Sequence, residues 1–227
     1  MITFYAAVGS YRIKTQNGSK MPFIQKLGKL YPISIPEFVI WSTLLWEVMT
    51  YDELKKQYEN LIAGFDAKTP AFDELLEMLL KRKLIVRGLG YTGSDALFNM
   101  LSNAFIIPYC LSVPQKAWTV LRLWLVGKLT TGEAFAALKH EQTDENEDRV
   151  SRLIEQTPLS TAEIVRCFDR DIYDVSTPEK VIAGIYPDEK SDQFHIANEE
   201  IGSNNTGKVM QAVANLYLSR KIVFEVV

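Results

Sequence analysis

Three glycines between residues 88 and 93 form the pattern in this chain that comes closest to a known chemical site. Gly88-Leu-Gly90-Tyr-Thr-Gly93 follows a short apolar segment and precedes a helical pattern. In that context, glycines let the backbone and a helix N-terminus approach a pyrophosphate, so the spacing suits a dinucleotide-binding loop. The acidic residue expected about 20 positions further on is missing, because the next carboxylate after Asp95 is Glu133. We therefore predict a glycine-rich turn here, and dinucleotide binding by residues 88–93 is the least favoured function.

The other residues that could do chemistry do not cluster. His140 and His195 lie far apart in the chain, and Cys110 and Cys167 have no partner spacing. A metal site needs several ligands at short, regular spacings, and the acidic run 144–148 lacks the pattern of a calcium loop. The sequence predicts reduced core cysteines, no metal site, no cofactor and no catalytic set. We therefore expect that the protein is not an enzyme.

Composition and charge restrict the classes of partner. The chain has 227 residues, of which 47% are hydrophobic and 23% charged, as in ordinary globular proteins. It has no signal-peptide pattern and no apolar run of about 18 residues, so we expect a cytoplasmic protein without membrane contact. Residues 1–140 carry 16 Lys+Arg and 11 Asp+Glu, whereas residues 141–200 carry 6 and 16. The acidic stretch would repel a phosphate backbone, and the flanking parts could tolerate one.

The first third of the chain predicts a β-hairpin followed by three helices and a strand. Tyr11 and Ile13 alternate with polar residues, Asn17-Gly18 suits a two-residue turn, and Pro22 indicates an edge strand. An apolar helix opens at Pro36. The elements that follow are a helix started by the capping box Thr50-Tyr-Asp-Glu53, a turn at 63–69, a helix from Pro70 to about Arg82, and a short strand at 84–86.

The last third repeats this order. Residues 145–156 predict a helix, Ser160-Thr-Ala-Glu163 is a second capping box, and a further helix begins at Asn204 or Asn205. Arg220-Lys221-Ile222-Val223 matches Arg82-Lys83-Leu84-Ile85 in type and context. The second copy then holds about 28 extra residues between its second and third helices, and we interpret the pair as a weak internal repeat. Between the copies we expect connector helices at 95–103, capped by Ser94, at 118–125 and at 134–138.

The order helix, capped helix, turn, third helix, strand and glycine-rich turn resembles the winged-helix variant of the helix-turn-helix superfamily. The resemblance covers about 140 of the 227 residues. It implies a mainly α fold with small β elements (α+β), in which two winged-helix-like units are joined by a helical connector and preceded by the hairpin. We place the domain boundary at the charged run after residue 142, which gives domains 1–142 and 143–227. Families of this kind are mostly transcriptional regulators.

Nucleic-acid binding depends on the exposed face of each third helix, whose first turns would meet base edges. The second copy offers a face without negative charge, and Asn and Gln pair well with adenine. Its candidate DNA-binding residues are Asn204, Asn205, Thr206, Lys208, Gln211, Asn215 and Arg220. The first copy presents Asp73, Glu74 and Glu77, which would be repelled from a groove, although neighbouring cations could hold phosphates. These cations are Lys55, Lys56, Arg82, Lys83 and Arg87.

Three hypotheses follow from these patterns. The first is a DNA-binding transcriptional regulator or accessory factor that binds double-stranded DNA as a homodimer through its apolar helices. The second is a winged-helix protein that binds another protein, through Asp73, Glu74 and Glu77 and the exposed edge of the hairpin. The third is a dinucleotide-binding protein that uses Gly88, Gly90 and Gly93.

Overall fold

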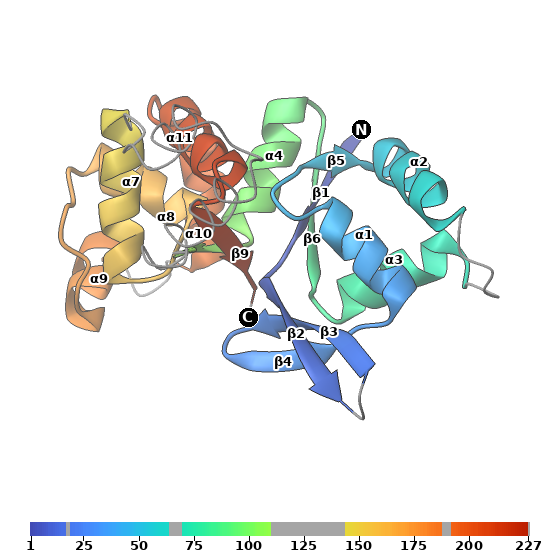
Figure 1. Cartoon of the computed structure of the whole chain (residues 1–227). Helices are drawn as coiled ribbons and strands as arrows, with labels where there is room; N and C mark the ends of the chain where they lie inside the picture. Colours follow the sequence, from blue (N-terminus) through green and yellow to red (C-terminus); the bar gives the residue numbers. More distant parts are fainter. Residues whose placement is uncertain (17–18, 64–69, 110–143, 188–191, 227) are drawn as a thin grey trace, which may run out of the picture.

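The computed structural model describes residues 1–16, 19–63, 70–109, 144–187 and 192–226 (Figure 1). Across these ranges the chain combines helices with small antiparallel sheets, which confirms the mixed class and the N-terminal hairpin. The predicted turn at Asn17-Gly18, most of the turn at 63–69, and the connector helices at 118–125 and 134–138 lie outside the described residues. Cys110 and His140 also lie outside them.

The first half of the described chain forms a strand, a three-stranded insertion and then a run of helices. Its elements are β1 (Ile2–Ala7), β2 (Ser10–Gln16), β3 (Ser19–Lys26), β4 (Lys29–Pro32), α1 (Ile35–Thr43), β5 (Met49–Thr50), α2 (Tyr51–Ile62), α3 (Phe72–Lys81), β6 (Ile85–Gly90), α4 (Gly93–Ser102) and β7 (Phe105–Pro108). Both α1 and α2 begin at a capping box, which Ser34 forms with Glu37 and Thr50 forms with Glu53. The predicted box at Thr50 is therefore confirmed.

The second half is mostly helical. Its elements are α7 (Glu145–Gln156), β8 (Leu159–Ser160), α8 (Thr161–Asp169), α9 (Pro178–Ile185), α10 (Gln193–Glu200), α11 (Thr206–Leu218) and β9 (Ile222–Glu225). The predicted helix 145–156 and the Ser160–Glu163 capping box are confirmed, and Asn205 is the residue that precedes α11. The helices α9 and α10 occupy the predicted insertion between the second and third helices.

The three small sheets have the strand orders β5-β1-β6, β2-β3-β4 and β8-β7-β9. In the first and third sheets the strand that comes first in the chain is central. In both, one neighbour is the short strand before a capped helix and the other is the strand after the last helix. The two sheets therefore share one topology, and β7 supplies the central strand of the sheet that residues 143–227 complete.

The helix-to-strand junctions of these two parts have the same backbone geometry. Lys83 and Arg220 both have positive φ angles, 53° and 60°. At each, the residue that follows donates its N–H to a carbonyl five positions earlier, which is the Schellman arrangement at a helix end. Lys83 therefore corresponds to Arg220, so the predicted alignment of Arg82 with Arg220 was wrong by one residue.

Several predicted element ends also need correction. Pro70 precedes α3 rather than opening it, and α4 is capped by Thr92, not Ser94. Pro22 lies in the central strand β3, not at an edge. It is tolerated there because β4 pairs only with Phe23–Lys26, so that Pro22 has no β4 partner.

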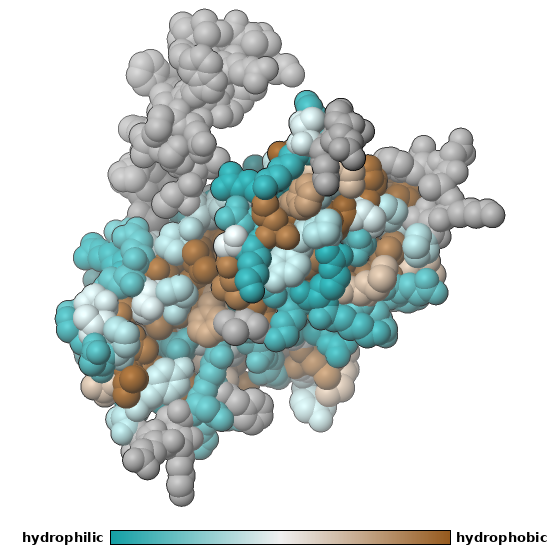
Figure 2. Space-filling model, turned by 90° about the horizontal axis from the view of Figure 1, so that it is seen from below, coloured by the Kyte–Doolittle hydropathy of each residue, from teal (hydrophilic) through white to brown (hydrophobic). Residues whose placement is uncertain are grey.

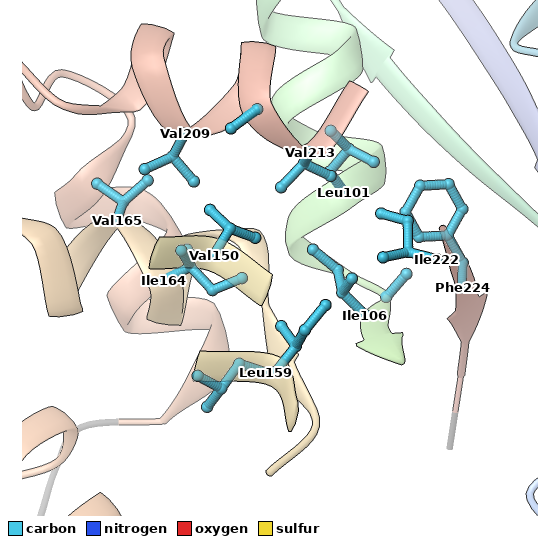
Figure 3. Close-up of a cluster of buried hydrophobic side chains, with 14 of the residues drawn as sticks. Leu101, Ile106, Val150, Leu159, Ile164, Val165, Val209, Val213, Ile222 and Phe224 are labelled. Carbon is cyan, nitrogen blue, oxygen red and sulfur yellow. The ribbon is translucent and has the colours of Figure 1, made fainter. Parts of the chain in front are cut away.

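Two clusters of buried side chains form the core. One holds α1, α2 and α3 against β1 and β3, and it includes Trp41, Leu54 and Leu79. The other joins β7, β8 and β9 to the helices α4, α7, α8 and α11 around Ile106, and Figure 3 shows its side chains converging. Because α4 and β7 belong to this second cluster, it joins residues that precede position 110 in the chain to residues that follow position 143.

Hydrogen bonds and one β-bridge tie the two parts together. The Tyr217 hydroxyl donates to the carbonyl of Leu44 at 2.9 Å and accepts from the N–H of Trp46 at 3.0 Å. The Gly9 N–H donates to the Phe224 carbonyl at 2.7 Å, beside a bridge between Val8 and Phe224. The β2-β3-β4 sheet leaves the body at this point and lies below the helices in Figure 1.

Candidate interaction surfaces

The glycines of the 88–93 motif bring a helix close to a strand. Gly88 and Gly90 lie within β6, which continues to Gly90, so the predicted turn at these positions was wrong. A Cβ atom added at Gly88 would come 2.2 Å from the Ala96 carbonyl oxygen, and one at Gly90 would come 2.3 Å from the Ala96 nitrogen. The backbone of α4 therefore fills the space that a pyrophosphate would need, and the absent side chains serve close helix–strand packing.

The structure describes the surroundings of Cys167, His195 and the acidic residues of the run 144–148, which the sequence singled out as titratable. Cys167 is buried, and desolvation raises the pKa of its thiol to about 12, which keeps it protonated. His195 is exposed and lies 3.1 Å from Glu199. The carboxylates at 145, 147 and 148 occupy the first turn of α7, where the helix dipole favours negative charge. Within the described ranges, no group of three or more His, Cys, Asp and Glu could hold a metal ion.

The polar residues at the start of α11 mostly bond within the protein. Asn205 donates to Asp169 at 2.7 Å, and the Thr206 hydroxyl is buried and donates to the Glu200 carbonyl at 2.6 Å. Asn215 donates to Glu147 on α7 at 2.9 Å. Lys208, Gln211 and Asn215 are the candidates exposed on this helix, and Asn204 is exposed just before it. Arg220 lies beyond its end with its guanidinium over the Trp46 ring, 5.2 Å from the ring centre.

The surface beside the α11 N-terminus is a polar hollow with a surplus of carboxylates. It is lined from α7 and the α8 end by Glu145, Asp148, Asp169 and Asp171, together with the cations Arg149, Arg152 and Lys208. Burial raises the pKa of Asp169, but hydrogen bonds from Ser203 and Asn205 outweigh this and hold it below its usual value. The Arg149 guanidinium lies between the rings of Phe168 and Tyr173, at 4.2 and 4.1 Å. A phosphate backbone would meet net repulsion here.

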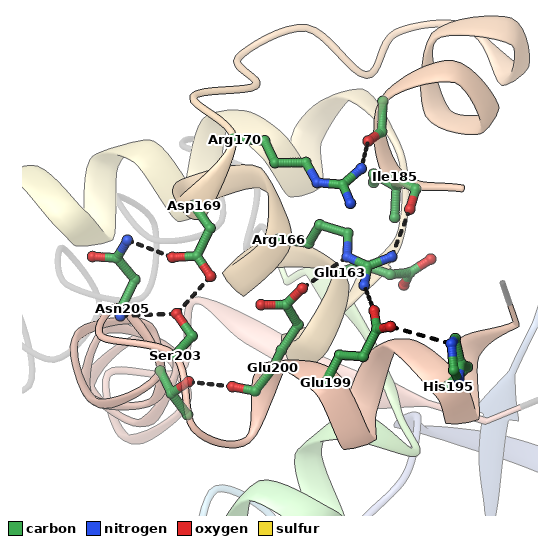
Figure 4. A network of polar contacts seen from close by, with 12 residues as sticks. Glu163, Arg166, Asp169, Arg170, Ile185, His195, Glu199, Glu200, Ser203 and Asn205 are labelled. Carbon is green, nitrogen blue, oxygen red and sulfur yellow. Dashed lines mark hydrogen bonds and ion pairs between the residues drawn. The ribbon is translucent and has the colours of Figure 1, made fainter. Parts of the chain in front are cut away.

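A buried ion network fixes the helices of the insertion. The Arg166 side chain on α8 is almost fully buried, and it donates to Glu199, to Glu200 and to the Ile185 carbonyl (Figure 4). Glu163, also on α8, accepts a hydrogen bond at 2.5 Å from the hydroxyl of Tyr186, the residue that follows α9. These contacts join α8, α9 and α10, so the network has a structural role that the sequence did not suggest.

The acidic face of α3 lies open to solvent. Glu74 and Glu77 are exposed, and Glu77 pairs with Lys81 one turn later at 3.2 Å. Asp73 accepts from the Tyr51 hydroxyl at 2.5 Å, a bond that raises the pKa of Tyr51 to about 12. The three predicted carboxylates therefore share one exposed face, as expected.

The predicted cations of the first copy are spread over several surfaces. Arg82 donates to Glu37 at 2.8 Å and to the Pro32 carbonyl, so it holds α3 against β4 and α1. Lys55 lies 5.8 Å from the centre of the Tyr51 ring, and Lys56 is exposed on α2. Lys83 and Arg87 meet in a shallow groove of about 420 Å³ that is also lined by Glu77, Lys81 and Val226.

The β2-β3-β4 sheet presents a surface that the sequence only partly revealed. β2 pairs with β3 alone, so within the described chain its outer edge has no strand partner. All five residues from Tyr11 to Thr15 are exposed. Residues 1–36 contain five cations and no carboxylate: Arg12, Lys14, Lys20, Lys26 and Lys29. Figure 2 views the molecule from below, the side on which this sheet lies in Figure 1, and on that side apolar and polar side chains lie next to one another.

Comparisons with protein-family models, curated proteins and solved structures give no match for this chain. In the part of the chain that the structure describes, no helix has the length and apolar character to cross a membrane.

Proposed function

We propose that the chain carries two divergent winged-helix-like units. The support is the repeated topology, in which a central strand, a helix, a short strand, a capped helix, a last helix and a strand follow in the same order. The matching positive φ angles at Lys83 and Arg220 add a second, independent correspondence. The β2-β3-β4 sheet is then an insertion in the first unit, and α9 and α10 are an insertion in the second.

We further propose that the protein is a non-catalytic binding module that recognises another protein, with a segment of the partner adding as a strand to the outer edge of β2. The observation that carries this proposal is the exposed outer edge of a seven-residue strand, which pairs with no other strand in the part of the chain that the structure describes. Such an edge offers a row of backbone N–H and C=O groups, which an extended peptide satisfies by forming a new ladder. Exposed edges of this length are aggregation sites unless charged side chains counter self-association, and β2 carries Arg12 and Lys14.

Two observations weigh against DNA recognition by the third helices. The α3 face carries Asp73, Glu74 and Glu77, and the hollow beside α11 carries four carboxylates. Asn205 and Asn215, the residues best suited to adenine, donate to Asp169 and Glu147. A base edge would have to displace these internal bonds while phosphates approached nearby carboxylates.

A DNA-binding regulator remains the second candidate, because the repeated helical order is typical of such proteins. In that case Lys208, Gln211 and Asn204 would contact the duplex. The affinity for random-sequence duplex DNA would fall steeply with salt and would drop further in a Lys208→Glu variant. Fluorescence anisotropy at low and moderate salt measures both effects.

Site-specific photo-cross-linking tests the protein-binding proposal. One variant carries a photoreactive amino acid in place of Thr15 on β2, and a matched control carries it in place of Gln211, which is exposed on α11. We expect irradiation in cells that express the chain to give protein adducts from position 15 that are absent from position 211. Adducts at position 211 that disappear after nuclease treatment, with none at position 15, would overturn the proposal in favour of the regulator.

A further inference from the structure

The pairing of β2 with β3 assigns its side chains to two faces. Because directly paired residues lie on the same face of a sheet, Tyr11 and Ile13 share a face with Ile24 and Pro22. Ile24 is fully buried in the core, so this face is turned toward the body. Arg12 and Lys14 lie on the opposite, outer face. A strand added beside β2 would therefore meet apolar and cationic side chains in alternation.

The exposed cations of the sheet, which include Arg12 and Lys14 on the outer face, have no ion-pair partner among the described carboxylates. Arg12 bonds to the amide oxygen of Gln25 at 2.9 Å, and no ion pair joins Arg12, Lys14, Lys20 or Lys29 to a described Asp or Glu. Glu225 accepts from the Leu27 N–H at 3.2 Å beside the buried Lys26. It lies at the β3–β4 turn, away from the β2 edge. Among the residues that the structure describes, the charge of Arg12 and Lys14 on β2 therefore has no ion-pair partner, although the chain as a whole has a net charge of −3.

The body-facing side of the same edge is apolar and incompletely covered. The Tyr11 ring packs edge-on against the Phe38 ring, with 6.1 Å between the ring centres, and Tyr11 is still 41% exposed. Ile13, two residues further along, is 60% exposed. A strand placed next to β2 would cover both side chains if its residues on that side were apolar.

We propose, on the basis of strand addition at β2, that the partner segment is an extended acidic peptide in which carboxylates alternate with β-branched or other apolar residues. Its apolar residues pack next to Tyr11 and Ile13, and its carboxylates lie across from Arg12 and Lys14. This pattern matches the edge in both charge and hydrophobicity. A nucleic acid would satisfy the cations but would place phosphates and sugars against the exposed Ile13 and Tyr11, so the sheet favours the peptide.

Three end-blocked peptides of equal length test the inference with the full-length chain. In them Val alternates with Glu, with Gln or with Lys. We expect the Glu/Val peptide to bind about tenfold more tightly than the Gln/Val peptide, equivalent to roughly 1.4 kcal/mol, with a difference that shrinks at high salt. The Lys/Val peptide should bind more weakly than both. Isothermal titration or anisotropy measures all three.

Charge-reversal variants locate the effect. The pair Arg12→Glu and Lys14→Glu should remove the preference for Glu over Gln. The matched pair Arg152→Glu and Lys180→Glu changes net charge by the same amount at exposed positions on α7 and α9, away from the sheet, and it should keep the preference. Circular dichroism and urea unfolding confirm that both double variants fold.

The outcomes separate the inference from the proposed function. N-methylation of the alternate peptide residues whose N–H groups face β2 should abolish binding, while methylation of the other set should not. Equal binding of the Glu/Val and Gln/Val peptides, with this methylation pattern intact, would overturn the acidic partner but support strand addition. Binding that ignores methylation would overturn strand addition itself, and salt-sensitive binding of duplex DNA that is lost in the Arg12 and Lys14 pair would overturn both.

Discussion

Glu225 offers a quantitative prediction about how the β2-β3-β4 sheet is held to the body. The carboxylate is buried at the end of β9 and accepts from the Leu27 N–H, and desolvation raises its pKa from the ordinary 4.5 to about 7. The hydrogen bond from Leu27 and the charge of Lys26 lower the pKa but do not offset the burial. Each unit of pKa difference between folded and unfolded states corresponds to 1.36 kcal/mol.

The sign follows from the direction of the shift. Because the folded protein binds the proton more tightly than the unfolded chain, the contribution of Glu225 to stability is complete below about pH 4.5. It is lost as the pH rises to about 7, and the total loss is at most about 3 kcal/mol. A Glu225→Gln variant keeps an oxygen that can accept from Leu27 and has no such dependence. It should equal the wild type near pH 4 and exceed its stability at pH 8.

Urea unfolding between pH 4 and pH 8 measures the difference, because all other titrating groups cancel between the two proteins. A Glu74→Gln variant, at an exposed position on α3, is the control and should follow the wild-type curve. A constant difference between wild type and Glu225→Gln across this range would refute the assigned burial of the carboxylate.

Three further substitutions test the packing and the caps by thermal or urea unfolding. Gly88→Ala should destabilise the fold by more than about 1 kcal/mol, since its Cβ would come 2.2 Å from a backbone oxygen of α4. The control Gly202→Ala has open space around its Cβ and should cost under about 1 kcal/mol. Equal losses of stability in the two variants would contradict the close approach of α4 to β6. Ser160→Ala removes the cap of α8 and should cost about 1 kcal/mol; no loss would mean that the capping box is not formed. Tyr217→Phe deletes the two hydrogen bonds that its hydroxyl makes to the first part, with Leu44 and Trp46, and should cost about 1–3 kcal/mol. An unchanged midpoint would show that these two bonds contribute nothing.

Features set by local sequence could be predicted. The capping boxes at Thr50 and Ser160 depend on residues three positions apart, and both helices begin where expected. Helix 145–156 follows from its apolar spacing, and the hairpin follows from alternation around a two-residue turn. The candidate face of α3 was also predictable, since its carboxylates project from one side of a regular helix.

Features set by contacts distant in sequence could not be predicted. The strands β5 and β8 have two residues each and exist only because β1 and β7 pair with them. The glycines at 88 and 90 indicate close approach, but the sequence does not reveal whether a ligand or α4 approaches them. The internal bonds of Asn205 and Asn215 were equally hidden, because Asp169 and Glu147 reach them only in the folded chain. A signal for the cationic sheet was present, namely a run of 36 residues without a carboxylate.

The central claim is that the outer edge of β2 accepts a strand, and residue-resolved hydrogen exchange tests it most directly. The backbone amides of residues 10–16 are followed with the full-length chain alone and saturated with the Glu/Val peptide. Strand addition predicts that alternate amides along β2 gain protection while those of α3 and α11 keep their rates. Protection confined to α3 or α11, with no change in residues 10–16, would contradict the account.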